Sequence, residues 1–243
     1  ESVLFKAYPM GYDPESMKIQ YLVIEEDQLQ ISQGTTGLVV WPAALRLFDY
    51  MNQNPSLVEG KTLLELGSGV GLCSIACRYL GAKSIIATDI DENVLARLKR
   101  NMENTSKTIE IPTDSVTKIH QITYTKPSTY TELILQPLTN SKQKAQGQFK
   151  TLKLDWETVK QEEIDEINAQ IILCADVIYS PELIPYLVAT LKKCLNRKST
   201  DNNKPIAILS ATIRQETTLQ LFLDVCKENN VLVELLQESS KER

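Results

Sequence analysis

Short apolar runs and amphipathic stretches alternate along most of the chain. The apolar runs are bounded by polar or glycine residues and predict buried strands, at residues 61–66, 84–88, 150–154, 171–175, 206–210 and 231–236. The stretches between them carry apolar side chains three and four positions apart and predict helices, at residues 42–51, 70–80, 91–102, 180–191 and 217–229. This alternation predicts an α/β fold, in which helices cover both faces of a mostly parallel sheet.

The N-terminal region departs from this alternation. Residues 19–24 and 28–33 are short and rich in β-forming residues, and the polar residues 25–27 separate them. Two such runs joined by a polar connection predict a β-hairpin. We therefore interpret residues 1–40 as an N-terminal β-hairpin extension and residues 41–243 as a single domain.

A second departure lies in the middle of the chain. Residues 105–150 are rich in Thr, Lys, Gln and Ser and show little periodicity. So long a connection within a compact domain is uncommon and usually has a functional role. We expect an insertion or loop here, with one irregular strand near residues 119–124.

Composition and charge narrow the function classes. The chain has 243 residues, of which 42% are hydrophobic and 23% charged, so it is expected to be globular rather than disordered. No apolar run reaches the roughly 18 residues that a membrane helix needs. The net charge of −5 disfavours tight binding to nucleic acid, which depends on neutralising phosphates, but is compatible with a basic protein partner.

Cysteine and histidine content argues against several kinds of active site. The five cysteines are odd in number, form no C-x-x-C pair and lie mostly in apolar runs, which is typical of reduced core thiols in an intracellular protein. His120 is the only histidine. A Ser-His-Asp triad and a multi-histidine zinc site are therefore not expected, and we predict no metal.

The strongest chemical signal is the sequence LLELGSGVG at residues 63–71, where a strand runs into a glycine-rich turn and then a helix. Gly67 and Gly69 allow the backbone to approach a ligand closely, and the N-terminus of the helix presents free N–H groups to it. The spacing is G-x-G-x-G, which differs from the G-x-G-x-x-G of nicotinamide-dependent enzymes. Glu65 would repel a pyrophosphate but suits a cationic ligand.

A second acid follows the next strand. Asp89 lies twenty-two positions beyond Gly67, where an acidic side chain accepts hydrogen bonds from ribose hydroxyls in doubly wound folds. Asp91 is better interpreted as the N-cap of the next helix. Glu65, Asp89 and the glycine turn together suit S-adenosylmethionine, which carries a sulfonium, an ammonium and a ribose.

The E-x-G-x-G-x-G motif followed by an acid at a strand end resembles the class I, seven-strand S-adenosylmethionine-dependent methyltransferases, which have a Rossmann-like fold. Three further segments resemble the protein lysine methyltransferases of this class: GLVVWPAA at 37–44, LDW at 154–156 and ADVIY at 175–179. Residues 31–39 and 212–217 are most similar to the elongation factor 2 lysine methyltransferases.

This resemblance implies a role for each candidate residue in cofactor binding. Glu65 would hold the amino-acid tail of the cofactor and Asp89 its ribose. Trp156 would stack on the adenine, Trp41 would pack on the cofactor's other side, and Asp155 would bind the adenine amine; core packing is the alternative interpretation of both tryptophans. The other implied cofactor-binding positions are Gly67, Ser68, Gly69 and Ala175.

The same resemblance assigns the catalytic positions to Asp176 and Tyr179. Asp176 follows an apolar strand at the carboxyl edge of the expected sheet, where doubly wound folds bind ligands. Its implied role is to hold the amine of the target lysine, and its alternative interpretation is a helix cap. Tyr179 would wall the lysine channel and donate a hydrogen bond.

The resulting hypothesis is a cytoplasmic, monomeric protein-lysine N-methyltransferase with elongation factor 2 as its protein substrate and with no nucleic-acid or membrane partner. A small-molecule methyltransferase is the main alternative, with residues 105–150 as a lid. A nucleic-acid amino-methyltransferase is disfavoured because residues 176–179 read DVIY, without the prolines typical of that class. A non-catalytic binding module is disfavoured because no motif is visibly broken.

Overall fold

The structure of the chain is a computed structural model that describes residues 3–13, 18–29, 31, 34–104, 109–112, 147–198 and 204–236. At its centre is a parallel five-stranded sheet. Its strands, in spatial order, are β6 (Gln148–Lys153), β4 (Ser84–Asp89), β3 (Thr62–Leu66), β7 (Ile171–Ala175) and β8 (Ile206–Ser210). The predicted α/β class and parallel sheet are therefore confirmed.

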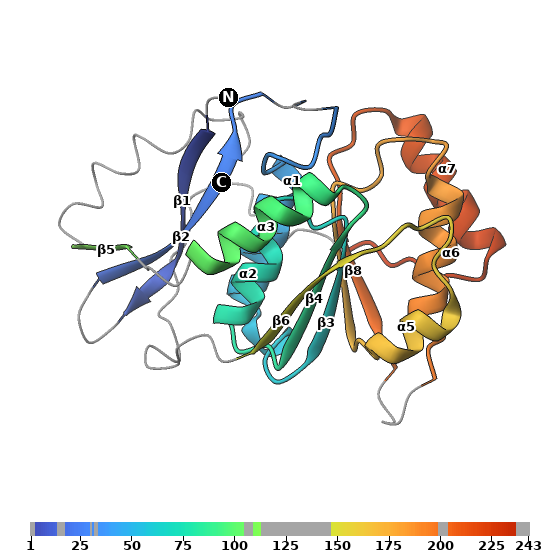
Figure 1. The fold of residues 1–243 in the computed structure, drawn as a ribbon. Coiled ribbons are helices and arrows are strands. Elements are labelled where there is room, and N and C mark those ends of the chain that lie inside the picture. The colour runs from blue at the N-terminus through green and yellow to red at the C-terminus, as the bar shows by residue number, and fades with distance from the viewer. Residues whose placement is uncertain are drawn as a thin grey trace, which may run out of the picture.

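Helices cover both faces of this sheet (Figure 1). One face carries α1 (Pro42–Gln53), α2 (Leu72–Tyr79) and α3 (Glu92–Asn104). The opposite face carries α5 (Gln161–Ile167), α6 (Ile184–Leu195) and α7 (Glu216–Glu228). A short 3-10 helix, Pro55–Leu57, follows α1. Within the described part of the chain, no helix combines the length and the apolar character needed to cross a membrane.

Alternation along each strand divides the core between the two faces. Leu63 of β3 packs with α1 and α2, whereas Leu64 packs with the helices of the other face. Strands covered by helices on both sides consist of continuous apolar residues. For this reason the apolar runs in the sequence predicted the positions of these strands well. All five cysteines are buried and carry free thiols, as predicted.

A second, antiparallel sheet lies beyond α3 and consists of β1 (Val3–Asp13), β2 (Lys18–Asp27) and β5 (Ile109–Pro112). Polar groups of α3 attach it to the main domain. Asn101 bonds both backbone groups of Glu25 and also donates to the carbonyl of Val70 in the glycine turn. Arg97 lies 3.0 Å from a carboxylate oxygen of Glu25 and 2.9 Å from one of Asp27.

The predicted hairpin exists and contains the strand predicted at 19–24, but the second strand assigned to it was wrong. Residues 19–24 lie in β2, whose partner is β1 and not the stretch 28–33. Of that stretch the structure describes residues 28, 29 and 31, none of which is in a strand. The polar residues 25–27 continue β2 because their carboxylates find partners elsewhere: Glu26 binds Lys6, Tyr8 and the backbone of Val40.

The strand predicted at 231–236 is also wrong, because these residues form no strand and Leu232 is 94% exposed. A run of β-forming residues gives a strand only where a sheet edge pairs with it. Helix α5 was not predicted, and α6 begins at Ile184 after a turn rather than at residue 180. The strand expected near 119–124, like His120, lies outside the described residues.

Candidate functional site

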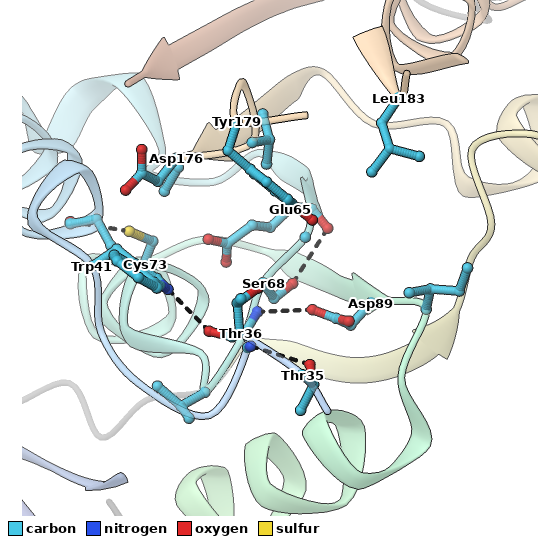
Figure 2. Close-up of a pocket in the computed structure, with 18 of the residues that line it drawn as sticks. Thr35, Thr36, Trp41, Glu65, Ser68, Cys73, Asp89, Asp176, Tyr179 and Leu183 are labelled. Atoms are coloured by element: carbon cyan, nitrogen blue, oxygen red, sulfur yellow. Dashed lines mark hydrogen bonds between the residues drawn. The ribbon is translucent and has the colours of Figure 1, made fainter. Parts of the chain in front are cut away.

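A cavity of about 490 Å³ opens at the carboxyl ends of β3, β4, β7 and β8. All eleven residues selected from the sequence line it: Trp41, Glu65, Gly67, Ser68, Gly69, Asp89, Asp155, Trp156, Ala175, Asp176 and Tyr179. In the view of Figure 2, Asp176 and Trp41 lie on one side of the cavity, Asp89 on the other and Glu65 between them. The structure therefore brings together residues that are up to 138 positions apart, from Trp41 to Tyr179.

The glycine turn after β3 forms the floor of the site. Gly67 has φ of 67°, and a Cβ there would lie 3.1 Å from Val177 Cγ1 and 3.5 Å from the ring of Trp156. Gly71 has φ of 95°, and a Cβ there would lie 1.9 Å from Leu98 Cδ1. The turn therefore needs glycine for its backbone conformation, and also because neighbouring side chains fill the space.

Glu65 is an almost fully buried acid, with 2% of the residue exposed. The hydroxyl of Ser74 on α2 donates a hydrogen bond to its carboxylate. Burial raises the pKa of Glu65 to about 8, the Ser74 hydrogen bond opposes this shift, and the charge of Asp89 adds to it. Among the described residues no basic side chain forms an ion pair with Glu65, so its charged form is poorly stabilised in the ligand-free cavity.

Asp89 ends β4 and orders the loops around it. One carboxylate oxygen accepts the N–H of Gly69 at 3.1 Å and the other accepts the N–H of Asp91 at 3.2 Å. Burial raises the pKa of Asp89 in spite of these hydrogen bonds. Asp91 itself accepts hydrogen bonds from the N–H groups of Asn93 and Val94, so its prediction as an N-cap is confirmed.

Two of the selected polar side chains are engaged in holding turns. The hydroxyl of Ser68 donates to the carbonyls of Glu65 and Thr88. The carboxylate of Asp155 accepts the N–H of Glu157 at 2.9 Å and the hydroxyl of Thr158 at 3.2 Å. These two side chains shape the cavity wall. The carbonyl of Asp155 also accepts the N–H groups of Thr158 and Val159, so both the side chain and the carbonyl of this residue hold the turn.

The two tryptophans that line the cavity have different contacts. Trp156 packs against the glycine turn, as its distance from the Gly67 position shows. The indole Nε1 of Trp41 donates to the carbonyl of Thr36 at 2.9 Å, which fixes the ring's orientation (Figure 2). The guanidinium carbon of Arg214 lies 5.0 Å from the centre of the Trp41 ring, which is a cation–π distance.

Asp176 follows β7 with φ of 58°, and its side chain is only 3% exposed. Arg214 grips its carboxylate with two hydrogen bonds, from Nη1 at 2.9 Å and from Nη2 at 2.8 Å. The N–H of Thr212 donates a third at 3.1 Å. The alternative interpretation of Asp176 as a helix cap is wrong, because its partners lie in the loop after β8 and α6 begins at Ile184.

Tyr179 stands at the mouth of the cavity and is 51% exposed. Its hydroxyl interacts with the side chain of Thr36, and burial of part of the ring raises its pKa. Leu183 and Tyr186, which also line the cavity, are each exposed by more than a third. This part of the mouth therefore presents apolar and aromatic side chains to an approaching partner.

Sequence reasoning gave no role to Arg214. It lay within the segment 212–217, whose importance came from its resemblance alone. One signal could have found it: it follows β8 by four positions, at the sheet edge that also carries Asp89 and Asp176. Ser74 and Tyr186 were missed because each lies within a helix that was interpreted as core packing.

Comparison with known proteins places the chain in a family. A sequence profile described as lysine methyltransferase matches residues 17–121 and 109–229. The chain belongs to this lysine methyltransferase family. The resemblance stated from the motifs is thereby confirmed.

Individual relatives of the lysine methyltransferase family agree with this assignment. The chain is 30% identical over 218 residues to the bovine protein-lysine N-methyltransferase EEF2KMT, covering 86% of the chain and 59% of that protein. It is 29% identical to the human EEF2KMT, over 83% of the chain and 53% of that protein. It is 28% identical to the protein-lysine N-methyltransferase EFM3 of Chaetomium thermophilum, over 84% of the chain and 51% of that protein.

The chain thus spans between half and three-fifths of the length of these relatives. Among solved structures, the S-adenosylmethionine-dependent methyltransferase of Agrobacterium tumefaciens matches with a TM-score of 0.51 and 13% identity, over 93% of the chain and 59% of that structure. A likeness at this identity supports the methyltransferase fold and nothing finer.

Proposed function

We propose that the chain is an S-adenosylmethionine-dependent protein-lysine N-methyltransferase that acts on a translation factor, elongation factor 2. One observation carries the proposal. A single cavity joins the buried Glu65 and the half-buried Asp89, which have no basic partner among the described residues, to a third acid, Asp176, at its other edge. The first two suit the donor molecule, and the third suits the amine that receives the methyl group.

The residues of the β3–β4 edge fit S-adenosylmethionine. Glu65 would pair with the ammonium of the amino-acid tail. This cation would stabilise the charged form of the carboxylate, which burial disfavours in the ligand-free cavity. Asp89 would accept hydrogen bonds from the ribose, and Trp156 offers a flat ring to the adenine. The cavity volume of about 490 Å³ lies within the range of small-molecule sites.

Methyl transfer to lysine needs a neutral amine, because the ammonium has no lone pair. Bound S-adenosylmethionine supplies an electrophilic methyl group, so positioning is most of what the protein has to do. A lysine side chain has an ordinary pKa of about 10.4, and desolvation in the cavity favours its neutral form. Asp176 would attract the ammonium and orient the amine after its proton leaves to water, while Tyr179 walls the channel.

The choice of elongation factor 2 as the substrate rests on the relatives rather than on the cavity. EEF2KMT and EFM3 are named protein-lysine N-methyltransferases, and they match most of this chain. The exposed aromatic and apolar side chains at the mouth of the cavity favour a polypeptide over a small solute, because a folded partner can cover them. A translation factor also implies action in the cytoplasm.

Mass spectrometry of elongation factor 2 tests the proposal. Purified elongation factor 2 is incubated with the chain and S-adenosylmethionine, and its peptides are weighed. The expected result is a gain of one to three methyl groups on one lysine. The variant Arg100→Gln, which removes an exposed arginine that pairs with Glu25 and does not line the cavity, should give the same result. If calorimetry detects the demethylated cofactor bound to the chain but no lysine of elongation factor 2 gains a methyl group, the proposed substrate is wrong.

A further inference from the structure

The carboxylate of Asp176 is already paired with a cation of the protein itself. The guanidinium of Arg214 forms two parallel hydrogen bonds with it, at 2.9 and 2.8 Å, in the geometry that arginine uses to bind carboxylates. The Asp176 side chain is 3% exposed, whereas that of Arg214 is 42% exposed. Arg214 thus covers Asp176, and no second cation can reach the carboxylate until Arg214 moves.

The place that the guanidinium fills has a second wall. The ring of Trp41 lies 5.0 Å from the guanidinium carbon, so the cation sits between a carboxylate and an aromatic face. Proteins recognise alkylammonium groups with this pair of features. The chemistry of the position is therefore that of an amine-binding site.

This position is built without help from Arg214. The N–H of Thr212 holds one oxygen of Asp176, and the N–H of Asp176 donates to the carbonyl of Ser210 at 2.8 Å. Trp41 is held separately by its bond to Thr36. If the guanidinium withdrew, the carboxylate and the ring would stay in place, and another cation could replace it without rebuilding the site.

We infer that Arg214 occupies the amine-binding position in the substrate-free protein and gives it up to the target lysine. This inference rests on the proposed function, because it identifies the amine as that of the substrate. The exchange replaces one cation on Asp176 with another, so the buried carboxylate is paired before and after. Arg214 can withdraw because it lies in the loop after β8 and nearly half of its side chain already faces solvent.

The exchange has a consequence for substrate choice. A ligand that competes with an internal group binds more weakly by the fraction of time that the site is open. A free amine has only the carboxylate and the ring to bind, whereas a lysine on a docked protein gains further contacts. Arg214 therefore acts as a positioning residue that weakens every amine by the same factor, and the further contacts of a docked protein are what allow its lysine to bind in spite of that loss.

Binding of n-butylammonium, a lysine side-chain analogue, tests the inference without a protein substrate. Saturation-transfer NMR with the demethylated cofactor present compares the wild type with Arg214→Gln and Arg214→Ala, and thermal melting checks that each variant is folded. We expect the probe to bind both variants about fivefold or more tightly than it binds the wild type. Adding Asp176→Asn to either Arg214 variant should abolish that gain. Arg100→Gln, which also removes an arginine, should leave binding of the probe as in the wild type. Equal binding to the wild type and both variants overturns the inference.

Steady-state kinetics with elongation factor 2 gives the second readout. Loss of the competing cation should lower KM for the protein substrate and leave kcat within about twofold. A fall in kcat with unchanged KM would instead show that Arg214 acts in the transition state, and the inference would be wrong. If the wild type methylates no lysine of elongation factor 2, the proposed function fails, while the butylammonium measurement still decides whether Arg214 shields a cation site.

Discussion

The β3–β4 edge and the β7–β8 edge of the cavity both carry buried carboxylates, but the two edges satisfy them differently. At the β3–β4 edge, the hydrogen bonds that Glu65 and Asp89 receive from described residues come from Ser74 and from backbone N–H groups, and burial raises the pKa of both. At the β7–β8 edge, Asp176 is gripped by a guanidinium. Among the described residues, the acids of the β3–β4 edge have no cationic partner, whereas Asp176 at the β7–β8 edge has one.

This difference indicates how each edge meets its ligand. An acid whose charged form is poorly stabilised gains from a cationic ligand without giving up an existing partner. An acid that already holds a cation can only exchange it. The β3–β4 edge can therefore bind a cationic ligand directly, whereas at the β7–β8 edge the ligand must displace Arg214. Substitutions at one edge at a time distinguish the contributions of the two edges.

The largest effect is expected from Asp176→Asn, which keeps the shape of the side chain and removes its charge. Because the neutral amide attracts and orients the lysine amine poorly, we expect the rate of methyl transfer to fall about 100-fold or more. Affinity for the demethylated cofactor, measured by calorimetry, should stay within about threefold, because Asp176 lies at the other edge. A variant that keeps the wild-type rate would show that this edge does not hold the amine.

An intermediate effect is expected from Glu65→Gln at the opposite edge. The loss of a charge-assisted interaction of about 1.5–3 kcal/mol should weaken cofactor binding about 10- to 100-fold by calorimetry. The melting temperature of the ligand-free protein at neutral pH should stay nearly unchanged, because the raised pKa keeps Glu65 mostly neutral there. Glu59→Gln, which neutralises an exposed acid elsewhere, is the control. Unchanged cofactor affinity in Glu65→Gln would remove Glu65 from the binding site.

The smallest effect is a proton released when the cofactor binds. The pKa of Glu65 is raised to about 8 from its ordinary value of 4.5, so the folded protein holds this proton at pH 7. Its contribution to stability is present below pH 4.5 and is lost as the pH rises through about 8. A cationic ligand lowers the pKa and expels the proton, so affinity should rise between pH 6 and pH 8, by at most about tenfold per pH unit.

Calorimetry in two buffers of different ionisation enthalpy measures this proton directly. At pH 7 the wild type should release up to about one proton more than Glu65→Gln does on binding the demethylated cofactor. The variant serves as the control because the cofactor's own amine titrates equally with both proteins. Equal proton release by the two proteins would mean that Glu65 stays protonated in the complex and does not pair with the ligand.

Much of the fold and the membership of the cavity could be predicted from the sequence, because both depend on local patterns. Strands buried on both faces read as apolar runs, and their ends bring Glu65, Asp89 and Asp176 to one edge of a parallel sheet. The glycine turn has a spacing that few other structures require. All eleven selected residues line one cavity for this reason, although their individual roles stay predictions.

The failures have a common cause, which is that the partner of a residue lies far away in the chain. The polar residues 25–27 were interpreted as a turn, yet they continue β2 because α3 and β1 supply partners for their carboxylates. Residues 231–236 have the composition of a strand, but no strand forms where no sheet edge pairs with them.

The sequence by itself determined the five strands of the parallel sheet and most of the helices between them, the glycine turn and the acids that end the strands, because each of these is encoded by neighbouring residues. Only the tertiary structure decided the state of those acids. Asp176 and Arg214 are 38 positions apart, and nothing local indicates that the guanidinium pairs with this carboxylate while no described residue supplies a cation to Glu65 or Asp89. The partner and the protonation state of a buried acid depend on all the groups that folding brings near it. They are therefore set only in the folded chain.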